Sequence, residues 1–300
     1  MTARGWLLFA AASVLFGTPY LFVKIALDGG VEPAGIAFAR AAVAAAVLVP
    51  LAAATGGLRN VRGRWSAVAG LGVLGMILPF VLVAVGEQTI SSSLAGILVA
   101  TAPIWVALLA LAVDRSERFD RVRGLGLVIG FAGVVALLGV NVTGKDALLG
   151  ALAVLALAVS YATATLLYGR LLRDVSPLGV TAAAMALATG ALAAPAALAV
   201  DAAPGAGPLA ALVALGLLST AAGYVAYYAL VQEAGAGRTA VTLYVNPAVA
   251  VLLGVVLLEE PLGPGAVVGL LLLLAGSRLA MGRSRWRSLL GERSSPASVR

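Results

Sequence analysis

Thr239 to Glu260 reads TAVTLYVNPAVAVLLGVVLLEE, an apolar stretch long enough to cross a bilayer, with an Asn-Pro step and a single tyrosine near its middle. Subtracting 144 from each residue number gives Ala95 to Ser116, AGILVATAPIWVALLALAVDRS, and Pro103 then aligns with Pro247. Two apolar segments interrupted at corresponding places in the two halves of a membrane chain are typical of the substrate site of a transporter. The pair therefore predicts a transporter built from two related halves.

The composition is that of an integral membrane protein. Apolar residues make up 62% of the 300 residues, charged residues make up 11%, and the mean hydropathy is +1.06, whereas about a quarter of the residues of a soluble domain are charged. Apolar runs of roughly twenty residues recur to the C-terminus, unlike the short alternating segments of outer-membrane barrels. The first run, Trp6 to Leu27, is too long for the core of a signal peptide and is expected to be the first span. We therefore predict an all-α membrane protein.

Ten transmembrane helices fit the pattern of apolar runs and loop residues. Clusters such as Asp28-Gly29-Gly30 and Pro261-Leu262-Gly263-Pro264 separate the runs. Each run is close to the twenty residues that a bilayer requires. The predicted spans cover about residues 6–27, 33–54, 66–86, 91–113, 122–140, 147–169, 177–200, 208–231, 237–258 and 265–281.

The positively charged residues indicate how these spans are oriented, because cytoplasmic loops are enriched in lysine and arginine. Both termini are predicted to be cytoplasmic, in the inner membrane of a bacterium. The basic tail, residues 284–300, follows the last span directly, so we expect it to contact anionic lipid rather than nucleic acid. In this orientation the outer loops hold only Lys145, and the inner segments hold Arg4, Arg59, Arg62, Arg64, Arg115, Arg118, Arg121, Arg123, Arg170, Arg173, Arg238, Arg278, Arg283, Arg285, Arg287, Arg293 and Arg300.

Further sequence matches indicate that the two halves are copies of one five-helix unit. Because five is an odd number, the second copy enters the membrane from the opposite side, and the halves form an inverted repeat. The predicted units are residues 1–143 and 144–283, followed by the tail. The matches are Glu32-Pro33 with Ser176-Pro177 at the shift of 144, and Gly126 and Gly133 with Gly269 and Gly276 at a shift of 143.

The chain contains no cysteine and no histidine. Disulfides, thiol nucleophiles, haem ligation by histidine and nearly all zinc chemistry are therefore excluded, and we expect no cofactor. The acidic residues are scattered rather than gathered at one interface, which argues against a membrane enzyme. A channel would more often be an oligomer of subunits with few spans and a polar ring. Transport of a small molecule across the bilayer is the remaining class, and nothing indicates an obligate protein partner.

Several short motifs resemble those of the EamA-type drug/metabolite transporters, and the resemblance covers about the whole chain. Phe16-Gly17 is similar to the aromatic-glycine step of that family's first helix, and Lys24 and Arg40 lie where the family often has basic residues. Asp114 to Arg118 and Glu259-Glu260-Pro261 resemble the acidic turns after the fourth and ninth helices, although the first lacks the usual proline. The resemblance implies two tandem five-helix repeats. It also implies export of amino acids, including aromatic ones, or of other small metabolites by alternating access through a central cavity.

Four prolines within the predicted spans are candidate hinges or gates. Pro103 and Pro247 each remove a backbone donor and release a carbonyl that lipid cannot satisfy but a cavity can use. A proline in a membrane helix is more often a kink that serves packing. Because these two occupy corresponding places in the two halves, a kink for packing and a role at the substrate site are equally consistent with them. Pro19 and Pro79 also lie within spans and are candidate gating kinks.

Lys24 and Arg40 are the two basic residues that fall within or close to spans. A charge at the bilayer centre costs on the order of 3 kcal/mol, so neither side chain is expected to face lipid. Lys24 can extend to the membrane surface near Asp28, and Arg40 can pair with Glu32 or with backbone carbonyls. The alternative is that they recognise a carboxylate or phosphate of the substrate.

Aromatic residues near mid-depth are candidates for the wall of a substrate cavity. A buried phenol or indole needs a polar partner, and an aromatic wall can bind a flat or cationic ligand. The alternative for each of these residues is core packing. The candidates are Tyr20, Trp105, Tyr161, Tyr224, Tyr227 and Tyr244, with Asn246 close to the last of them.

The predicted spans place no carboxylate at mid-membrane, where proton-coupled transporters usually keep one. Glu87-Gln88 ends the third span and Gln232-Glu233 ends the eighth, and these pairs are candidates to gate or cap the pathway. The expected mode is facilitated transport, or weak proton coupling through Glu87.

Two substrate classes are consistent with these residues. In the first, Lys24 or Arg40 binds the carboxylate of an amino acid or related metabolite, and the aromatic residues hold its side chain. In the second, the tyrosines bind a lipophilic or quaternary cation for efflux, and Lys24 has no role. A sugar phosphate is less consistent with the sequence, since the second half offers no mid-span lysine or arginine to clamp a dianion.

Overall fold

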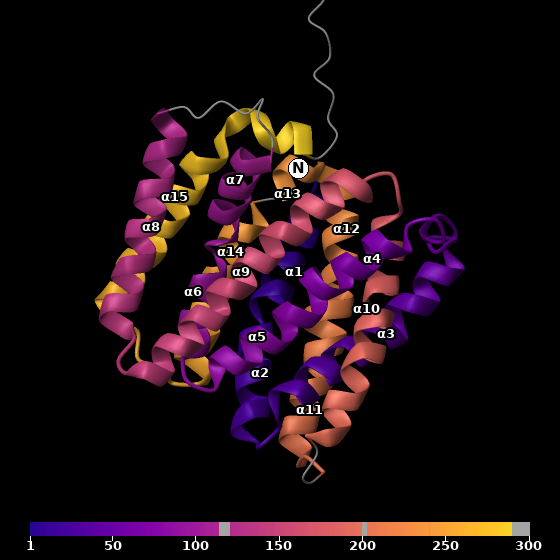
Figure 1. Cartoon of the computed structure of the whole chain (residues 1–300), viewed down its shortest axis with the longest axis horizontal. Helices are drawn as coiled ribbons and strands as arrows, with labels where there is room; N and C mark the ends of the chain where they lie inside the picture. Colours follow the sequence, from indigo (N-terminus) through magenta and orange to yellow (C-terminus); the bar gives the residue numbers. More distant parts are fainter. Residues whose placement is uncertain (114–120, 200–202, 240, 290–300) are drawn as a thin grey trace, which may run out of the picture.

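The fold is known from a computed structural model, which describes residues 1–113, 121–199, 203–239 and 241–289. The described residues form helices and no strands (Figure 1). The first half contains α1 (Ala3–Gly17), α2 (Pro19–Asp28), α3 (Pro33–Ala54), the 3₁₀ turn η1 (Arg59–Val61), α4 (Trp65–Gly72), the π-helical η2 (Val73–Ile77), α5 (Leu78–Glu87), α6 (Ser92–Val99), α7 (Ala102–Val113) and α8 (Arg121–Asn141). The second half contains α9 (Lys145–Leu171), α10 (Pro177–Leu198), α11 (Ala206–Ala214), the π-helical η3 (Leu215–Ala222), α12 (Gly223–Ala234), α13 (Ala236–Thr239), α14 (Thr242–Leu257) and α15 (Pro264–Leu289).

Eight helical runs are long and apolar enough to cross a membrane, judged by length and composition. The last two predicted spans correspond to shorter apolar helices, Thr242–Leu257 and Pro264–Ala280, the second of which is the apolar part of α15 (Pro264–Leu289). The chain is thus a multi-pass helical membrane protein. The eight runs are Ala3–Asp28, Pro33–Ala54, Trp65–Glu87, Ser92–Leu111, Arg121–Gly139, Lys145–Leu171, Pro177–Leu198 and Ala206–Ala234.

The most extensive helix contacts join the first half of the chain to the second. α8 packs along α15, and Figure 1 shows these two helices side by side at one edge of the molecule. In the same way α3 packs along α10, α5 along α9, α6 along α14, and α1 along α12. The halves are therefore interleaved, and the apolar core around α3 and α10 contains residues of both.

Several spans are interrupted near their middle. The first is divided between α1 and α2, because Pro19 cannot donate the hydrogen bond that would continue α1. The third and eighth spans instead contain η2 and η3, and subtracting 144 from the bounds of η3 gives a range that includes all of η2. Because π-helical turns are frequent at functional sites, the centres of the third and eighth spans are candidate functional regions.

The paired prolines behave differently from each other, contrary to the predicted matching interruptions. The fourth span is divided at Ala100-Thr101, and Pro103 lies in the first turn of α7. Pro247 instead lies inside α14, which continues through it. With its amide oriented as its neighbours require, the Asn246 nitrogen donates to the Thr242 carbonyl at 2.7 Å and to a carbonyl of α1 at 3.2 Å. The Asn246 side chain thus provides hydrogen-bond donors next to Pro247, which has none of its own, and stabilises this turn of α14.

The acidic turn after α14 caps a helix of the other half. Glu260 Oε1 accepts a hydrogen bond from the Ser92 N–H at 2.7 Å, and Oε2 accepts from the Ser93 N–H at 2.9 Å and from its hydroxyl at 2.5 Å. Ser92 is the first residue of α6, where backbone N–H groups have no partner within the helix. The positive end of the helix dipole also favours the carboxylate. Glu260 thus fastens the end of α14 to the start of α6.

Replacing Glu260 by glutamine is expected to lower the free energy of unfolding by about 2 kcal/mol, because hydrogen bonds to a charged group contribute about 1.5–3 kcal/mol. Thermal unfolding of the purified protein in detergent measures the change. Glu259→Gln is the matched control, since Glu259 is exposed and is expected to shift stability by no more than about 0.5 kcal/mol. Equal effects of the two substitutions would show that Glu260 is not a cap of this kind.

Candidate substrate site

Arg40, on α3, is a buried cation in the interior of the helical bundle. Its side chain is only 7% exposed, and its Nε donates to the Thr220 hydroxyl at 3.0 Å. Its guanidinium carbon lies 3.9 Å from the centroid of the Phe80 ring, a cation–π contact. Within the described part of the chain, no carboxylate lies within ion-pairing distance of Arg40; the two ion pairs found there are Lys24–Asp28 and Arg64–Asp174. The predicted pairing of Arg40 with Glu32 is therefore not present.

The two π-helical segments position the partners of Arg40. In η3, the Thr220 hydroxyl donates to the Leu215 carbonyl at 2.9 Å, which leaves its oxygen facing the arginine as an acceptor. Phe80 follows η2 by one turn of α5. The Tyr224 hydroxyl, on α12 directly after η3, lies 4.0 Å from the Met76 sulfur of η2. The sequence pairs the two segments as well, since Phe80 aligns with Tyr224 and Met76 with Thr220 at the shift of 144.

Three helices each contribute one tyrosine to the region around this arginine. Tyr20 on α2, Tyr161 on α9 and Tyr224 on α12 all lie within electrostatic range of the Arg40 charge. Tyr224 is part of a larger aromatic group on α12, which continues through Tyr228 in a stacked arrangement with ring centroids 5.8 Å apart. We call Arg40, Phe80, Thr220 and these tyrosines (Tyr20, Tyr161, Tyr224) the Arg40 cluster. It combines a buried positive charge with an aromatic wall.

One end of the molecule carries a pocket of about 240 Å³, here called the Lys24 pocket. Lys24 forms an ion pair with Asp28 at 3.1 Å, and its ammonium also lies 3.5 Å from the backbone carbonyl of Glu87. The Glu87 side chain is fully buried, and neither carboxyl oxygen has a hydrogen-bond partner among the described residues. The pocket is lined by Lys24, Leu27, Asp28, Gly30, Val31, Glu32 and Gln88.

A second pocket, of about 270 Å³, lies between α3, α10 and α12 and is here called the Tyr228 pocket. Tyr228 is hydrogen-bonded to the Thr181 hydroxyl, which fixes the phenol at the inner wall. Two lining residues, Ser176 and Gln232, correspond to Glu32 and Gln88 of the Lys24 pocket at the shift of 144. Arg40 lines neither pocket. The lining residues are Thr55, Ser176, Pro177, Leu178, Tyr228, Val231 and Gln232.

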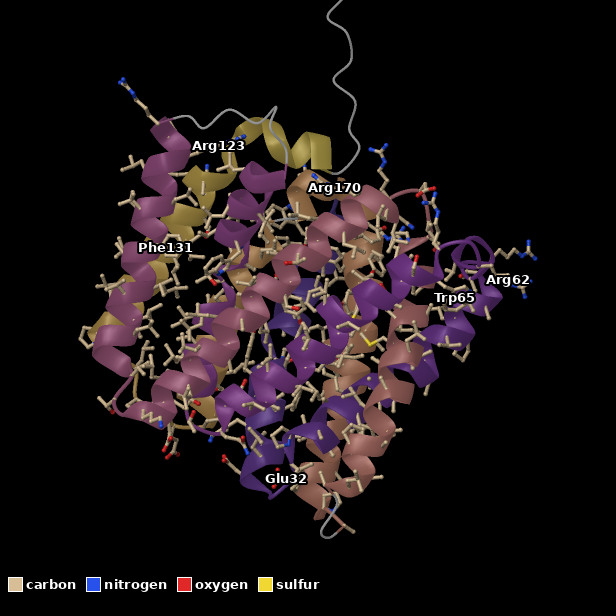
Figure 2. All side chains as sticks on the ribbon, in the orientation of Figure 1. Glu32, Arg62, Trp65, Arg123, Phe131 and Arg170 are labelled. Atoms are coloured by element: carbon tan, nitrogen blue, oxygen red, sulfur yellow. The ribbon has the colours of Figure 1, made fainter. Side chains whose placement is uncertain are left out.

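Other predicted site residues lie elsewhere. Trp105 donates to the Thr101 hydroxyl at 3.2 Å and packs edge-to-face on Phe131 of α8, which Figure 2 labels at the edge of the molecule. Tyr244 lies within electrostatic range of Arg278 on α15. Asn246 joins α14 to α1, as described above. Trp105 and Asn246 thus join neighbouring helices, and none of these contacts reaches the Arg40 cluster.

The predicted gates are distributed along the spans. Pro79 and Pro103 are buried in the first turns of α5 and α7, and Pro19 begins α2. Tyr227 lies one ring from the cluster, packed on Phe16 of α1 with ring centroids 5.7 Å apart.

Three residues at this site were not predicted from the sequence, namely Phe80, Thr220 and Met76. At the shift of 144 the sequence aligns Phe80 with Tyr224. Phe80 is nevertheless an apolar residue in an apolar span, and such a residue gives no sign of a binding role by itself. Thr220 acquires its role only because η3 turns its hydroxyl toward Arg40.

Helices that cross a membrane, with a buried cation and aromatic side chains between two pockets, define a multi-pass membrane transporter rather than an enzyme. The profile of the EamA-like transporter family matches residues 3–139 and 148–282, and the chain belongs to this family.

Individual relatives agree with this assignment. The chain is 28% identical over 280 residues to a protein of Archaeoglobus fulgidus described as an uncharacterized transporter, a match that covers 91% of this chain and 97% of the relative. It is 33% identical over 298 residues to a probable terminal-alkyne amino-acid exporter of Streptantibioticus cattleyicolor, covering 93% and 95%. A solved structure described only as the crystal structure of a protein has the same fold, with a TM-score of 0.65, 21% identity and coverage of 93% and 97%.

Proposed function

We propose that this transporter exports amino acids or related small metabolites, and that Arg40 binds the carboxylate of the substrate. The observation that carries the proposal is the burial of Arg40 without a carboxylate partner among the described residues. A buried guanidinium is costly unless it is paired, and its planar donors match a carboxylate. Tyr20, Tyr161 and Tyr224 would then contact the rest of the substrate. The amino-acid exporter that is 33% identical supports the same substrate class.

The proposed architecture is two inverted five-helix repeats, residues 1–143 and 144–283, with the basic tail 284–300 and both termini in the cytoplasm of a bacterium. The correspondence of η2 with η3 and the crosswise packing of α5 on α9 and α1 on α12 support a two-fold relation of this kind. The arginines support the orientation, since Arg123 and Arg170 lie at the N-terminal end of the molecule and Glu32 lies at the other (Figure 2).

Alternating access is the proposed mechanism. The Lys24 pocket and the Tyr228 pocket lie at opposite ends of the same set of helices, and the Arg40 cluster lies between them without lining either. Substrate would reach Arg40 through one pocket at a time, as α1, α6 and their partners in the other half move around the breaks near Pro19 and Pro103. In this orientation the Lys24 pocket faces outward.

Efflux of lipophilic or quaternary cations is the second candidate. The rings of Phe16, Tyr224, Tyr227 and Tyr228 form a continuous aromatic group that could hold such a cation. The nearby positive charge of Arg40 opposes a cation, which is why the carboxylate is preferred.

Counterflow in proteoliposomes tests the proposal. The panel pairs each of several amino acids with its carboxyl amide, which keeps the side chain and removes the negative charge, and adds tetraphenylphosphonium as the lipophilic cation. We expect the amino acids to exchange at least about tenfold faster than their amides, because a charge-assisted hydrogen bond is lost. Equal rates for acids and amides, or exchange of tetraphenylphosphonium alone, would overturn the assignment of Arg40.

A further inference from the structure

We propose that Glu87 is a proton-binding site, and that the proton on this carboxyl keeps the Lys24-pocket end of the pathway closed. This proposal concerns what drives the transporter rather than what it carries. Of the two modes expected from the sequence, facilitated transport and weak proton coupling through Glu87, it favours the second and assigns Glu87 a specific role in it.

The burial of Glu87 favours an uncharged side chain in this conformation. Glu87 is the last residue of α5, its side chain is 0% exposed, and both carboxyl oxygens are without a hydrogen-bond partner among the described residues. An ionised carboxylate accepts hydrogen bonds at both oxygens and is very costly to enclose without them. A carboxylic acid carries no charge and can be enclosed at much lower cost.

The groups that face Glu87 come from several elements. α2 contributes Lys24, Asp28 and Tyr20, and Arg40 on α3 lies within electrostatic range. From the second half, Glu260 adds a negative charge that is already bonded to the start of α6.

The remaining neighbours of this turn are uncharged. On α6, the Ser92 hydroxyl is buried and also lacks a partner in the described chain. On α9, Gly150 and Val154 pack against Gly86, the residue before Glu87. Among the charged groups, the Asp28 and Glu260 carboxylates oppose a negative charge on Glu87, and Lys24 and Arg40 favour one.

Lys24 is paired with Asp28 and lies close to Glu87, and this placement provides the switch. In the present conformation its ammonium is paired with Asp28 at 3.1 Å and reaches Glu87 only through the backbone carbonyl at 3.5 Å. Loss of the Glu87 proton creates a buried negative charge, which attracts Lys24 away from Asp28 and draws water into the Lys24 pocket. That rearrangement separates α2 from the turn after α5 and opens this end.

If the proposed function holds, proton binding and transport are linked. A proton taken up from the Lys24 pocket would close that end, and its release at the Tyr228-pocket end would reset the protein for the next substrate. One proton then moves inward as substrate moves outward, which is antiport.

The absence of cysteine from the sequence allows a test that needs no substrate. Leu27, half-buried in the wall of the Lys24 pocket, is replaced by cysteine, and the rate of labelling by a charged maleimide is measured from low to high pH in detergent. The same series is run with Glu87→Gln, which imitates the protonated carboxyl, and with Glu32→Gln, an exposed carboxyl of the same pocket, as matched control. Thiol reactivity itself rises with pH. The quantity to compare is therefore the labelling rate with native Glu87 divided by the rate with Glu87→Gln or with Glu32→Gln at the same pH.

At high pH, we expect Leu27→Cys to be labelled about tenfold faster with native Glu87 than with Glu87→Gln. This is the change produced when the open conformation rises from roughly 10% of the population to most of it. At low pH the two rates should be equal, and Glu32→Gln should follow the native curve. Identical pH profiles for Glu87 and Glu87→Gln would overturn the proposal.

A second measurement uses the native protein, so it remains possible if the Glu87→Gln variant fails to fold. Infrared spectra of the native protein should contain the carbonyl band of a protonated carboxyl at neutral pH, and its absence would also overturn the proposal. Neither readout depends on amino-acid flux, so a pH-dependent pocket in a protein that fails the counterflow assay would contradict the proposed substrate and leave the proton site intact.

Discussion

Replacing Arg40 by glutamine is expected to reduce the rate of amino-acid counterflow about tenfold to a hundredfold. Arg40 is the buried cation between the two pockets, and a hydrogen bond to a charged group contributes about 1.5–3 kcal/mol to binding, which converts to this range. Glutamine keeps a donor near Thr220 and removes the charge and the guanidinium fork. Transport of the carboxyl amides should be unaffected, because they do not use the charge.

Two further variants separate binding from folding. Arg40→Lys retains the charge but loses the planar geometry, so an intermediate loss is expected. Arg64→Gln removes an exposed arginine that pairs with Asp174 at 3.0 Å, and such a surface pair contributes at most about 1 kcal/mol. Full amino-acid counterflow in a well-folded Arg40→Gln protein would exclude Arg40 as the carboxylate site.

Replacing Gly276 by alanine is expected to destabilise the protein by about 3 kcal/mol, at the upper end for overpacking. An added methyl group would meet the backbone of α8, with the Gly130 Cα at 2.6 Å and the Gly126 carbonyl oxygen at 2.7 Å. Backbone atoms cannot turn aside as a flexible side chain can, so α8 and α15 must separate along their contact. Thermal unfolding in detergent measures the loss.

The matched control is Gly139→Ala on α8, because a methyl group there meets no atom within 4 Å. Alanine is the better helix former by about 0.8–1 kcal/mol, so this variant should be as stable as the native protein or more so. If Gly276→Ala unfolds at the same temperature as Gly139→Ala, the α8–α15 contact is looser than the structure indicates.

The helical class and the positions of the spans were predictable because both depend on local composition. A run of apolar residues must form its backbone hydrogen bonds internally in lipid, so its length alone predicts a helix. The family was predictable for a similar reason, since Phe16-Gly17 and the acidic turn at Glu260 are short and contiguous motifs. The function of that turn was not, because its partners Ser92 and Ser93 lie more than 160 residues away in sequence.

The candidate site was predictable in its chemistry but not in its geometry. Arg40 and the tyrosines stand out as polar groups in apolar spans, and Tyr20, Tyr161 and Tyr224 do gather near the arginine. The π-helical turns that aim Thr220 and Phe80 have no sequence signature. The burial of Glu87 depends on the packing of α2, α5 and α9, which span boundaries do not reveal.

The interleaving of the two halves also has a consequence for how the chain is made. α3, α5, α6 and α8 all have their most extensive contacts with helices that leave the ribosome later. After synthesis of its first half, the protein therefore holds inserted helices whose small-residue and polar faces are still open to lipid. The most extensive contacts of these helices can form only after α9 and the later helices have been made, so the first half alone exposes surfaces that the finished protein buries.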